Sequence, residues 1–147
     1  MALNKPKAIY ERVMLIDDNE IDNFINQKMM EGCNFAENLY IHTSGRSGLE
    51  FLRNLASNKE ILPKMLPQLI FLDINMPVMD GFQFANEFDK LGKDVTENCK
   101  ILMLTSSINP EDIENSKRSP SVIRYLNKPL SHEVLLSLSG ILSSLPA

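Results

Sequence analysis

The sequence contains little that points to a membrane, a metal-thiolate site or nucleic acid. No apolar run approaches the roughly 20 residues of a membrane-spanning helix, so we expect a cytoplasmic protein without membrane association. The two cysteines, Cys33 and Cys99, fit no disulfide or metal spacing, and we expect both thiols to stay reduced. The net charge is -4 and the basic residues are dispersed, which argues against nucleic acid as a partner.

The length limits the chain to one domain. With 147 residues it can bury one ordinary core but not two. We expect the polar residues 1–7 to form a flexible tail and residues 8–147 to form the domain. The sequence shows no internal repeat and no low-complexity segment.

Short apolar runs bounded by turn residues predict strands that are buried on both faces. The clearest run covers residues 69–72 and ends on Asp73. Pro77 and Gly81 follow it, and neither residue can continue a central strand. Four similar runs predict further strands at 13–16, 39–41, 101–104 and 122–126.

Helical patterns separate these strands. The first begins at Glu20 and ends at Gly32, with apolar residues on one face at positions 21, 24, 25 and 29. The other helices are predicted over 44–57, 80–92, 110–120 and 131–145. The helix from Pro110 has Ile113 almost alone as an apolar residue, which makes it a candidate moving part. The connection 58–68 is unusually long, and the sequence indicates no role for it.

Five strand-then-helix units predict an α/β fold, with a doubly wound, five-stranded parallel sheet covered by helices on both faces. All strands of such a sheet end along one edge, where open α/β sheets bind ligands. Five polar residues each directly follow a predicted strand and would converge at that edge: Asp17, Asp18, Asp73, Thr105 and Lys128.

These side chains suit phosphoryl transfer. Three neighbouring carboxylates need a cation, and oxygen ligands without His or Cys favour a hard ion such as Mg²⁺. A carboxylate can form an aspartyl phosphate when a metal and a positive charge neutralise the incoming group. Lys128 supplies that charge and Thr105 supplies a hydroxyl group, so the set is sufficient for phosphoryl transfer onto Asp73.

The chain carries a series of motifs in a fixed order: the pair Asp17-Asp18, the block D-x-x-M-P-x-M-D-G at 73–81, Thr105 with a small residue after it, and Tyr125-x-x-Lys128-Pro129. With these motifs it resembles the CheY-like receiver domains of bacterial two-component response regulators. The resemblance covers about residues 12–145 and implies the flavodoxin-like (βα)5 fold of that family.

The resemblance implies a role for each of the acids. Asp73 would be the phosphoacceptor, and Asp18 would bind Mg²⁺ directly together with Asp73. Asp17 would act on the ion largely through water. The backbone carbonyl of Asn75 would complete the protein's share of the coordination.

The resemblance also implies a switch. Lys128 would bind a phosphoryl oxygen, and Thr105, followed by Ser106, would move toward the phosphate. Tyr125 would then rotate inward and link the acidic edge to the surface formed by the last two predicted helices and the strand between them. Asn75 and Ser107 would flank the path of the water that hydrolyses the phosphoryl group, and both are small and uncharged.

The resulting hypothesis is a single-domain response regulator that is not a turnover enzyme. It would take a phosphoryl group from a sensor histidine kinase or phosphotransfer protein and bind a downstream protein, because the chain ends with the last helix. Alternatives are a receiver-fold binding module that works without phosphorylation, or a phosphate sink; the intact acid set argues against the former. A phosphatase would need a general acid where the sequence has the neutral Asn75.

Overall fold

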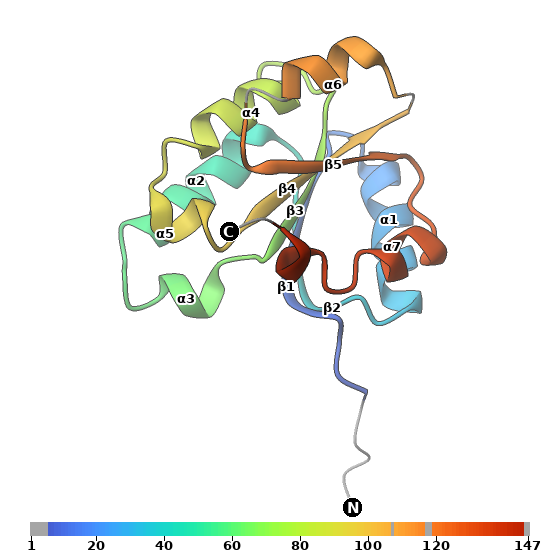
Figure 1. Cartoon of the computed structure of the whole chain (residues 1–147), viewed down its shortest axis with the longest axis horizontal. Helices are drawn as coiled ribbons and strands as arrows, with labels where there is room; N and C mark the ends of the chain where they lie inside the picture. The colour runs from blue at the N-terminus through green and yellow to red at the C-terminus, as the bar shows by residue number, and fades with distance from the viewer. Residues whose placement is uncertain (1–5, 107, 117–118, 146–147) are drawn as a thin grey trace, which may run out of the picture.

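The computed structural model describes residues 6–106, 108–116 and 119–145. A parallel five-stranded sheet with the order β2-β1-β3-β4-β5 lies at its centre (Figure 1). The strands are β1 (Tyr10–Ile16), β2 (Ala36–His42), β3 (Leu69–Asp73), β4 (Lys100–Thr105) and β5 (Val122–Asn127). The predicted doubly wound α/β fold is confirmed, and β1 and β2 begin three residues earlier than the apolar runs indicated.

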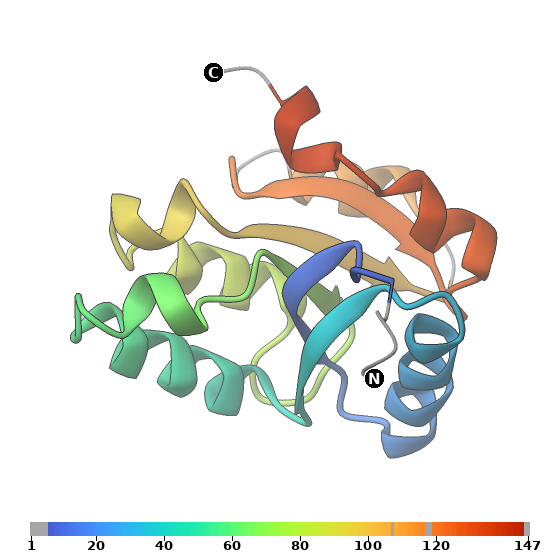
Figure 2. The same ribbon diagram turned by 90° about the horizontal axis from the view of Figure 1, so that it is seen from below.

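Helices cover both faces of the sheet (Figures 1 and 2). On one side lie α1 (Glu20–Gly32) and α7 (His132–Ser137), and on the other lie α2 (Gly45–Ala56), α3 (Leu62–Met65), α4 (Gly81–Phe88), α5 (Lys93–Thr96) and α6 (Pro110–Ser116). Alternate residues of β3 serve the two sides, because successive side chains of a strand point to opposite faces. Leu69 and Phe71 pack in the cluster with α1 and α7, whereas Ile70 and Leu72 pack in the cluster with α2 and α4.

The apolar face of α1 is not its buried face. Ile21 is 69% exposed and Phe24 is 58% exposed, whereas Asn23, Asn26 and Met30 are buried. The asparagines can be buried because they bond to backbone groups: Asn23 Nδ2 donates to the Asp17 carbonyl at 2.9 Å, and Asn26 Oδ1 accepts from the Leu130 amide at 3.1 Å. Hydrogen bonds to two loops therefore set the rotation of α1 about its axis. This rotation differs from the one that the hydrophobic pattern of the helix predicts.

The single helix predicted over 131–145 is interrupted. The helix α7 ends at Ser137, Gly140 adopts a left-handed φ of 73°, and a 3-10 helix covers Ile141–Ser144. A residue with positive φ cannot continue a right-handed helix, and glycine takes this conformation without a steric penalty. The apolar stripe nevertheless continues across the break, because Leu138 and Ile141 are both buried.

The start of α4 fits closely against the end of β3. Asp80 caps this helix: its side chain accepts a hydrogen bond from the Gln83 amide at 2.9 Å, and the Gln83 side chain accepts one from the Asp80 amide at 2.9 Å. A Cβ atom on Gly81 would lie 3.1 Å from the Asp73 carbonyl oxygen, so glycine allows the two elements to approach. This close contact places the start of α4 beside the acidic edge.

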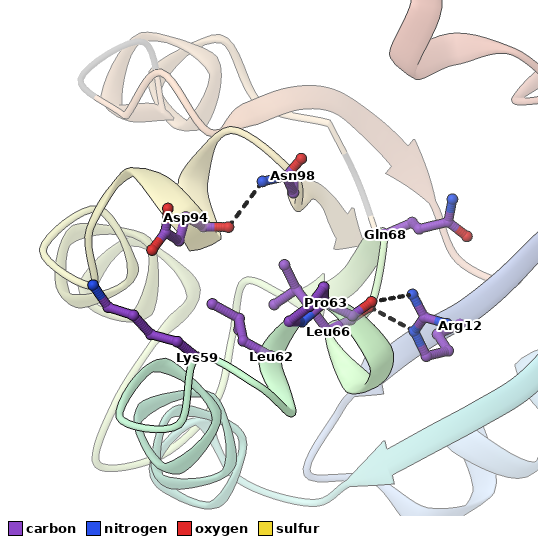
Figure 3. Close-up of a pocket in the computed structure, with 8 residues that line it drawn as sticks. All are labelled: Arg12, Lys59, Leu62, Pro63, Leu66, Gln68, Asp94 and Asn98. Carbon is purple, nitrogen blue, oxygen red and sulfur yellow. Dashed lines mark hydrogen bonds between the residues drawn. The ribbon is translucent and has the colours of Figure 1, made fainter.

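The long connection 58–68 folds back onto the opposite edge of the sheet. It contains α3, and its Leu62 and Leu66 are buried in the core. Arg12 of β1 holds it by donating to the carbonyls of Leu66 at 2.8 Å and Pro63 at 3.2 Å (Figure 3). A pocket of about 470 Å³ lies between this connection and the segment that carries α5. Within the described residues, none of the helices combines the length and apolar character that crossing a bilayer requires.

Candidate functional site

Three aspartates meet at the carboxyl edge of the sheet. Asp17 and Asp18 directly follow β1, and Asp73 ends the neighbouring strand β3. Each contributes a carboxylate oxygen, and these oxygens all lie within 4.8 Å of one another. Asp17 and Asp73 are buried, whereas Asp18 is exposed. The structure therefore brings together the three acids that the sequence placed at this edge.

Lys128, in the loop after β5, extends its ammonium group into this cluster. Its Nζ atom donates hydrogen bonds to Oδ2 of Asp17 at 2.9 Å and to Oδ2 of Asp22 at 3.0 Å. The same atom lies 3.4 Å from Oδ1 of Asp73. One partly buried cation thus compensates three carboxylates that come from two strand ends and from α1.

Asp22 is a site residue that the motifs do not reveal. It lies within the first turn of α1, where acids such as Glu20 are common because they interact favourably with the helix dipole. The sequence does hold one signal, which is that Asp22 lies in the first turn of the helix that directly follows the Asp17-Asp18 pair, four residues after Asp18. That spacing is compatible with a side chain directed back toward the same edge of the sheet.

Burial and crowding change the proton affinity of the two central groups. Burial, and then the nearby charge of Asp17, raise the pKa of Asp73 to about 6, although Lys128 acts in the opposite direction. Burial lowers the pKa of Lys128, but its hydrogen bonds to Asp17 and Asp22 outweigh that effect and hold this pKa above its usual value. At pH 7 Lys128 is therefore a fixed positive charge, and Asp73 is mostly ionised.

Backbone amides fix the orientation of the two buried carboxylates. The Asn19 amide donates to Oδ1 of Asp17 at 2.9 Å, and the Asn75 amide donates to Oδ1 of Asp73 at 3.2 Å. Each bond links an aspartate to the residue two positions later, which is the geometry of an Asx turn. The loops that follow β1 and β3 thereby hold both acids at the edge.

The donor set suits a hard divalent cation. The three acids offer oxygen ligands without nitrogen or sulfur, and such sets favour ions such as Mg²⁺ or Ca²⁺. In the described part of the chain the Asp18 carboxylate accepts no hydrogen bond, so its oxygens are open to an ion. Asp17 already binds the Asn19 amide and Lys128, which leaves it less able to ligate directly.

Thr105 and Ser106 lie at the end of β4, beside Asp73. The register pairs Asp73 with Leu104, and Thr105 follows as a buried residue. The carbonyl of Thr105 accepts a hydrogen bond from the Lys128 amide at 2.8 Å. Ser106 lines a hollow of about 380 Å³ next to Lys128, and Ser107 lies outside the described residues.

Tyr125 lies on β5, an edge strand of the sheet. It is half-buried in β5, on the side of the sheet that α2 and α4 cover. It borders a second hollow, of about 290 Å³, together with Ile113 of α6. The predicted switch tyrosine thus lies next to open space beneath the helix that the sequence indicated as weakly anchored.

The loop that carries Lys128 is anchored on α1. The Lys128–Pro129 peptide bond is cis, and the next residue, Leu130, donates its amide hydrogen to Oδ1 of Asn26. Leu130 itself is buried in the core. The loop that carries the Lys128 side chain is therefore held on both sides by hydrogen bonds, to Thr105 and to Asn26.

Comparison with known proteins agrees with this geometry. The response regulator receiver domain matches residues 13–139 of the chain. The chain belongs to this family. The receiver is 32% identical over 126 residues to the sensor histidine kinase CheAY of Helicobacter pylori, with 86% of the receiver and 14% of the kinase covered. It is 24% identical over 135 residues to the chemotaxis protein CheY of Halobacterium salinarum, with 91% of the receiver and 98% of CheY covered.

A solved structure of a response regulator has the same fold. A two-component response regulator from Cytophaga hutchinsonii superposes with a TM-score of 0.81 at 27% identity, covering 95% of the receiver and 100% of that chain. The predicted family, the CheY-like fold and the class of function, a receiver of two-component signalling, are confirmed. The receiver spans 14% of CheAY, so the activity of that whole kinase says little about this chain.

Proposed function

We propose that this receiver accepts a phosphoryl group on Asp73 in a Mg²⁺-dependent reaction and then changes its protein-binding surface. The observation that carries the proposal is the position of the buried Asp73 carboxylate. It lies 3.4 Å from Nζ of Lys128 and within 4.8 Å of oxygens from Asp17 and Asp18. A fixed cation and metal-binding carboxylates around a buried nucleophile are what neutralises an incoming phosphoryl group.

In the transfer, an Asp73 oxygen attacks the phosphorus of a phosphohistidine in a sensor histidine kinase or phosphotransfer protein. The new P–O bond forms as the P–N bond breaks, and the leaving imidazole keeps the bonding electron pair and takes a proton from water. Burial and the charge of Asp17 raise the pKa of Asp73 to about 6, whereas the charge of Lys128 lowers this pKa and so favours the ionised, nucleophilic carboxylate. Lys128 binds one of the phosphoryl oxygens.

Mg²⁺ fits the oxygen-only donors, and when bound it supplies positive charge that offsets the phosphoryl oxygens. We assign direct ligation to Asp18 and Asp73 and a further ligand to the backbone carbonyl of Asn75. Asp17 acts through water, because Asn19 and Lys128 already occupy its carboxylate oxygens.

The partner that delivers the phosphoryl group has to cover the acidic edge. Ile21, Phe24 and Ile25 of α1 are exposed apolar side chains, and Ile25 also borders the hollow beside Lys128. Apolar side chains that are exposed together are common at protein interfaces. These exposed side chains favour a protein as the phosphodonor, because a small-molecule donor would need contact with Asp73 and Lys128 alone.

The signal then passes from Thr105 to Tyr125. Thr105, followed by Ser106, binds the phosphoryl group, and the ring of Tyr125 moves into the hollow beside Ile113. A ligand shifts a two-state equilibrium only through its different interactions with the two states, and the Thr105 hydroxyl bond is such a difference. The face formed by α6, β5 and α7 thereby changes and binds the downstream protein.

Replacing Thr105 by alanine is expected to separate phosphorylation from switching. The Asp73 nucleophile and Lys128 remain, so adduct formation with acetyl phosphate should stay within about threefold of wild type, a small loss for a single hydroxyl group. The shift of the Tyr125 ring resonances on adding beryllium fluoride, a phosphoryl mimic, should disappear. Thr105→Ser, which keeps the hydroxyl group, should restore it. An unchanged Tyr125 shift in Thr105→Ala would contradict this path.

Three other readings make different predictions. A binding module independent of phosphorylation would form no adduct, and a phosphate sink would form one without changing its partner affinity. A phosphatase would turn over substrate, which the neutral Asn75 argues against, so we propose that the receiver is not a turnover enzyme. Asn75 and Ser107, both small and uncharged, favour a phosphoryl lifetime between the extremes.

Intact mass spectrometry with acetyl phosphate and Mg²⁺ tests the proposal directly. Wild type should gain the mass of one phosphoryl group, and Asp73→Asn should gain none because an amide cannot form the aspartyl phosphate. EDTA should prevent the gain in wild type. Asp94→Asn, an exposed aspartate at the other edge of the sheet, is the matched control and should behave as wild type. A persistent adduct on Asp73→Asn would rule out this assignment.

A further inference from the structure

Asp22 binds the ammonium group of Lys128 as closely as Asp17 does. Oδ2 of Asp22 lies 3.0 Å from Nζ of Lys128, and Oδ2 of Asp17 lies 2.9 Å from it. Oδ1 of Asp73 is farther away, at 3.4 Å. The ammonium group therefore lies nearer to these two acids than to the carboxylate that would carry the phosphoryl group.

Asp22 differs from Asp17 in its surroundings. It does not belong to the group of three acids whose oxygens could hold a metal ion. Its side chain is 35% exposed and lines the hollow of about 380 Å³ next to Lys128. Its negative charge thus faces Lys128 from the solvent side, outside the cluster of Asp17, Asp18 and Asp73.

Phosphorylation would place new negative charge and new acceptor oxygens beside Lys128. A phosphoryl group carries close to two negative charges and three strong acceptor oxygens. These oxygens need the ammonium group that Asp22 already holds, and the Asp22 carboxylate also repels the anionic donor. Because Asp22 is partly exposed, water and salt weaken both its hold on Lys128 and its repulsion of the donor, so its effect on phosphorylation is modest.

We propose that Asp22 is a positioning residue that draws Lys128 away from Asp73 in the resting receiver and so slows phosphorylation. The inference rests on the proposed function of Asp73 as phosphoacceptor. Asp22 acts through Lys128 and does not touch the phosphoryl group. Asp22 sets how readily the receiver accepts phosphate, and this effect requires an acidic side chain at this position of α1.

The test compares four proteins that each comprise the whole 147-residue chain: wild type, Asp22→Asn, Asp22→Glu and Glu20→Gln. Glu20 lies in the same first turn and is exposed, so Glu20→Gln removes an equal charge without touching Lys128. Initial phosphorylation rates are measured with acetyl phosphate at saturating Mg²⁺ by intact mass. The affinity for beryllium fluoride is measured by calorimetry, and circular dichroism verifies that each variant is folded.

Asp22→Asn should increase the rate about fivefold and lower the dissociation constant of beryllium fluoride by a similar factor, the size expected for a partly exposed ion pair. Asp22→Glu keeps the charge and should stay near wild type, and Glu20→Gln should change either quantity by less than about twofold. An unchanged or slower Asp22→Asn, or an equal gain in Glu20→Gln, would overturn the inference. If wild type forms no adduct on Asp73, the proposed function fails first and this inference fails with it.

Discussion

Replacing Lys128 by methionine is expected to impair both the phosphorylation and the stability of this receiver. The phosphorylation rate with acetyl phosphate should fall by a hundredfold or more, on the order of what removing a preorganised charge costs in other active sites. The free energy of unfolding at pH 8 without Mg²⁺ should fall by about 3 kcal/mol, because Asp17 and Asp73 are left buried without their counter-ion. Urea unfolding and intact mass measure the two effects.

Mg²⁺ distinguishes a lost charge from damaged packing. An ion bound by the three acids replaces part of the missing positive charge, so Mg²⁺ should stabilise Lys128→Met more than it stabilises wild type. It should leave the phosphorylation rate low, since the contact of Lys128 with the phosphoryl oxygen is still absent. Arg124→Met, an exposed cation on the preceding strand, is the matched control. Equal stability of Lys128→Met and wild type would show that Asp17, Asp22 and Asp73 do not need this lysine as a counter-ion.

The position of the site could be predicted from sequence because the parallel sheet brings distant residues together. Asp17, Asp73 and Lys128 each follow a strand, and the strands of a doubly wound sheet end at one edge. Their proximity depends on topology more than on side-chain detail. The sequence alone therefore predicts the acid cluster and the proximity of Lys128 to it.

The rotation of α1 could not be predicted in the same way. Hydrophobic periodicity places Ile21 and Phe24 inward, yet the buried positions hold Asn23 and Asn26. Their partners are the Asp17 carbonyl and the Leu130 amide, and Leu130 lies 104 residues away from Asn26 in the sequence. Apolar patterns contain no information about such bonds, which form only once the loops are in place.

The same rotation explains why Asp22 is a site residue. With Asn23 and Asn26 turned toward the sheet, the adjacent Asp22 reaches Lys128, although 106 residues separate the two in sequence. The exposed face of Ile21 and Phe24 is the other consequence. One departure from the hydrophobic pattern thus gives α1 both a contact with Lys128 and an apolar surface beside the site.

Asp73 should destabilise the resting fold when no metal is bound. Its pKa rises from 3.8 to about 6 on folding, mainly through burial and then through the charge of Asp17. The folded state therefore binds this proton more tightly than the unfolded state does. Stability falls as pH rises through the interval between these values and stays reduced above about pH 6, by about 2 kcal/mol after allowance for coupling to Lys128.

Asp73→Asn removes this ionisation and should raise the free energy of unfolding by about 2 kcal/mol at pH 8 in EDTA. The gain should vanish near pH 4, where the wild-type carboxyl group is protonated, and should shrink with Mg²⁺, because the ion binds the wild-type acids and stabilises them. Urea unfolding across this pH range measures both trends, and Asp94→Asn should change stability little. A less stable Asp73→Asn at pH 8 would mean that attraction to Lys128 outweighs burial and the charge of Asp17, so that the buried Asp73 carboxylate does not destabilise the fold.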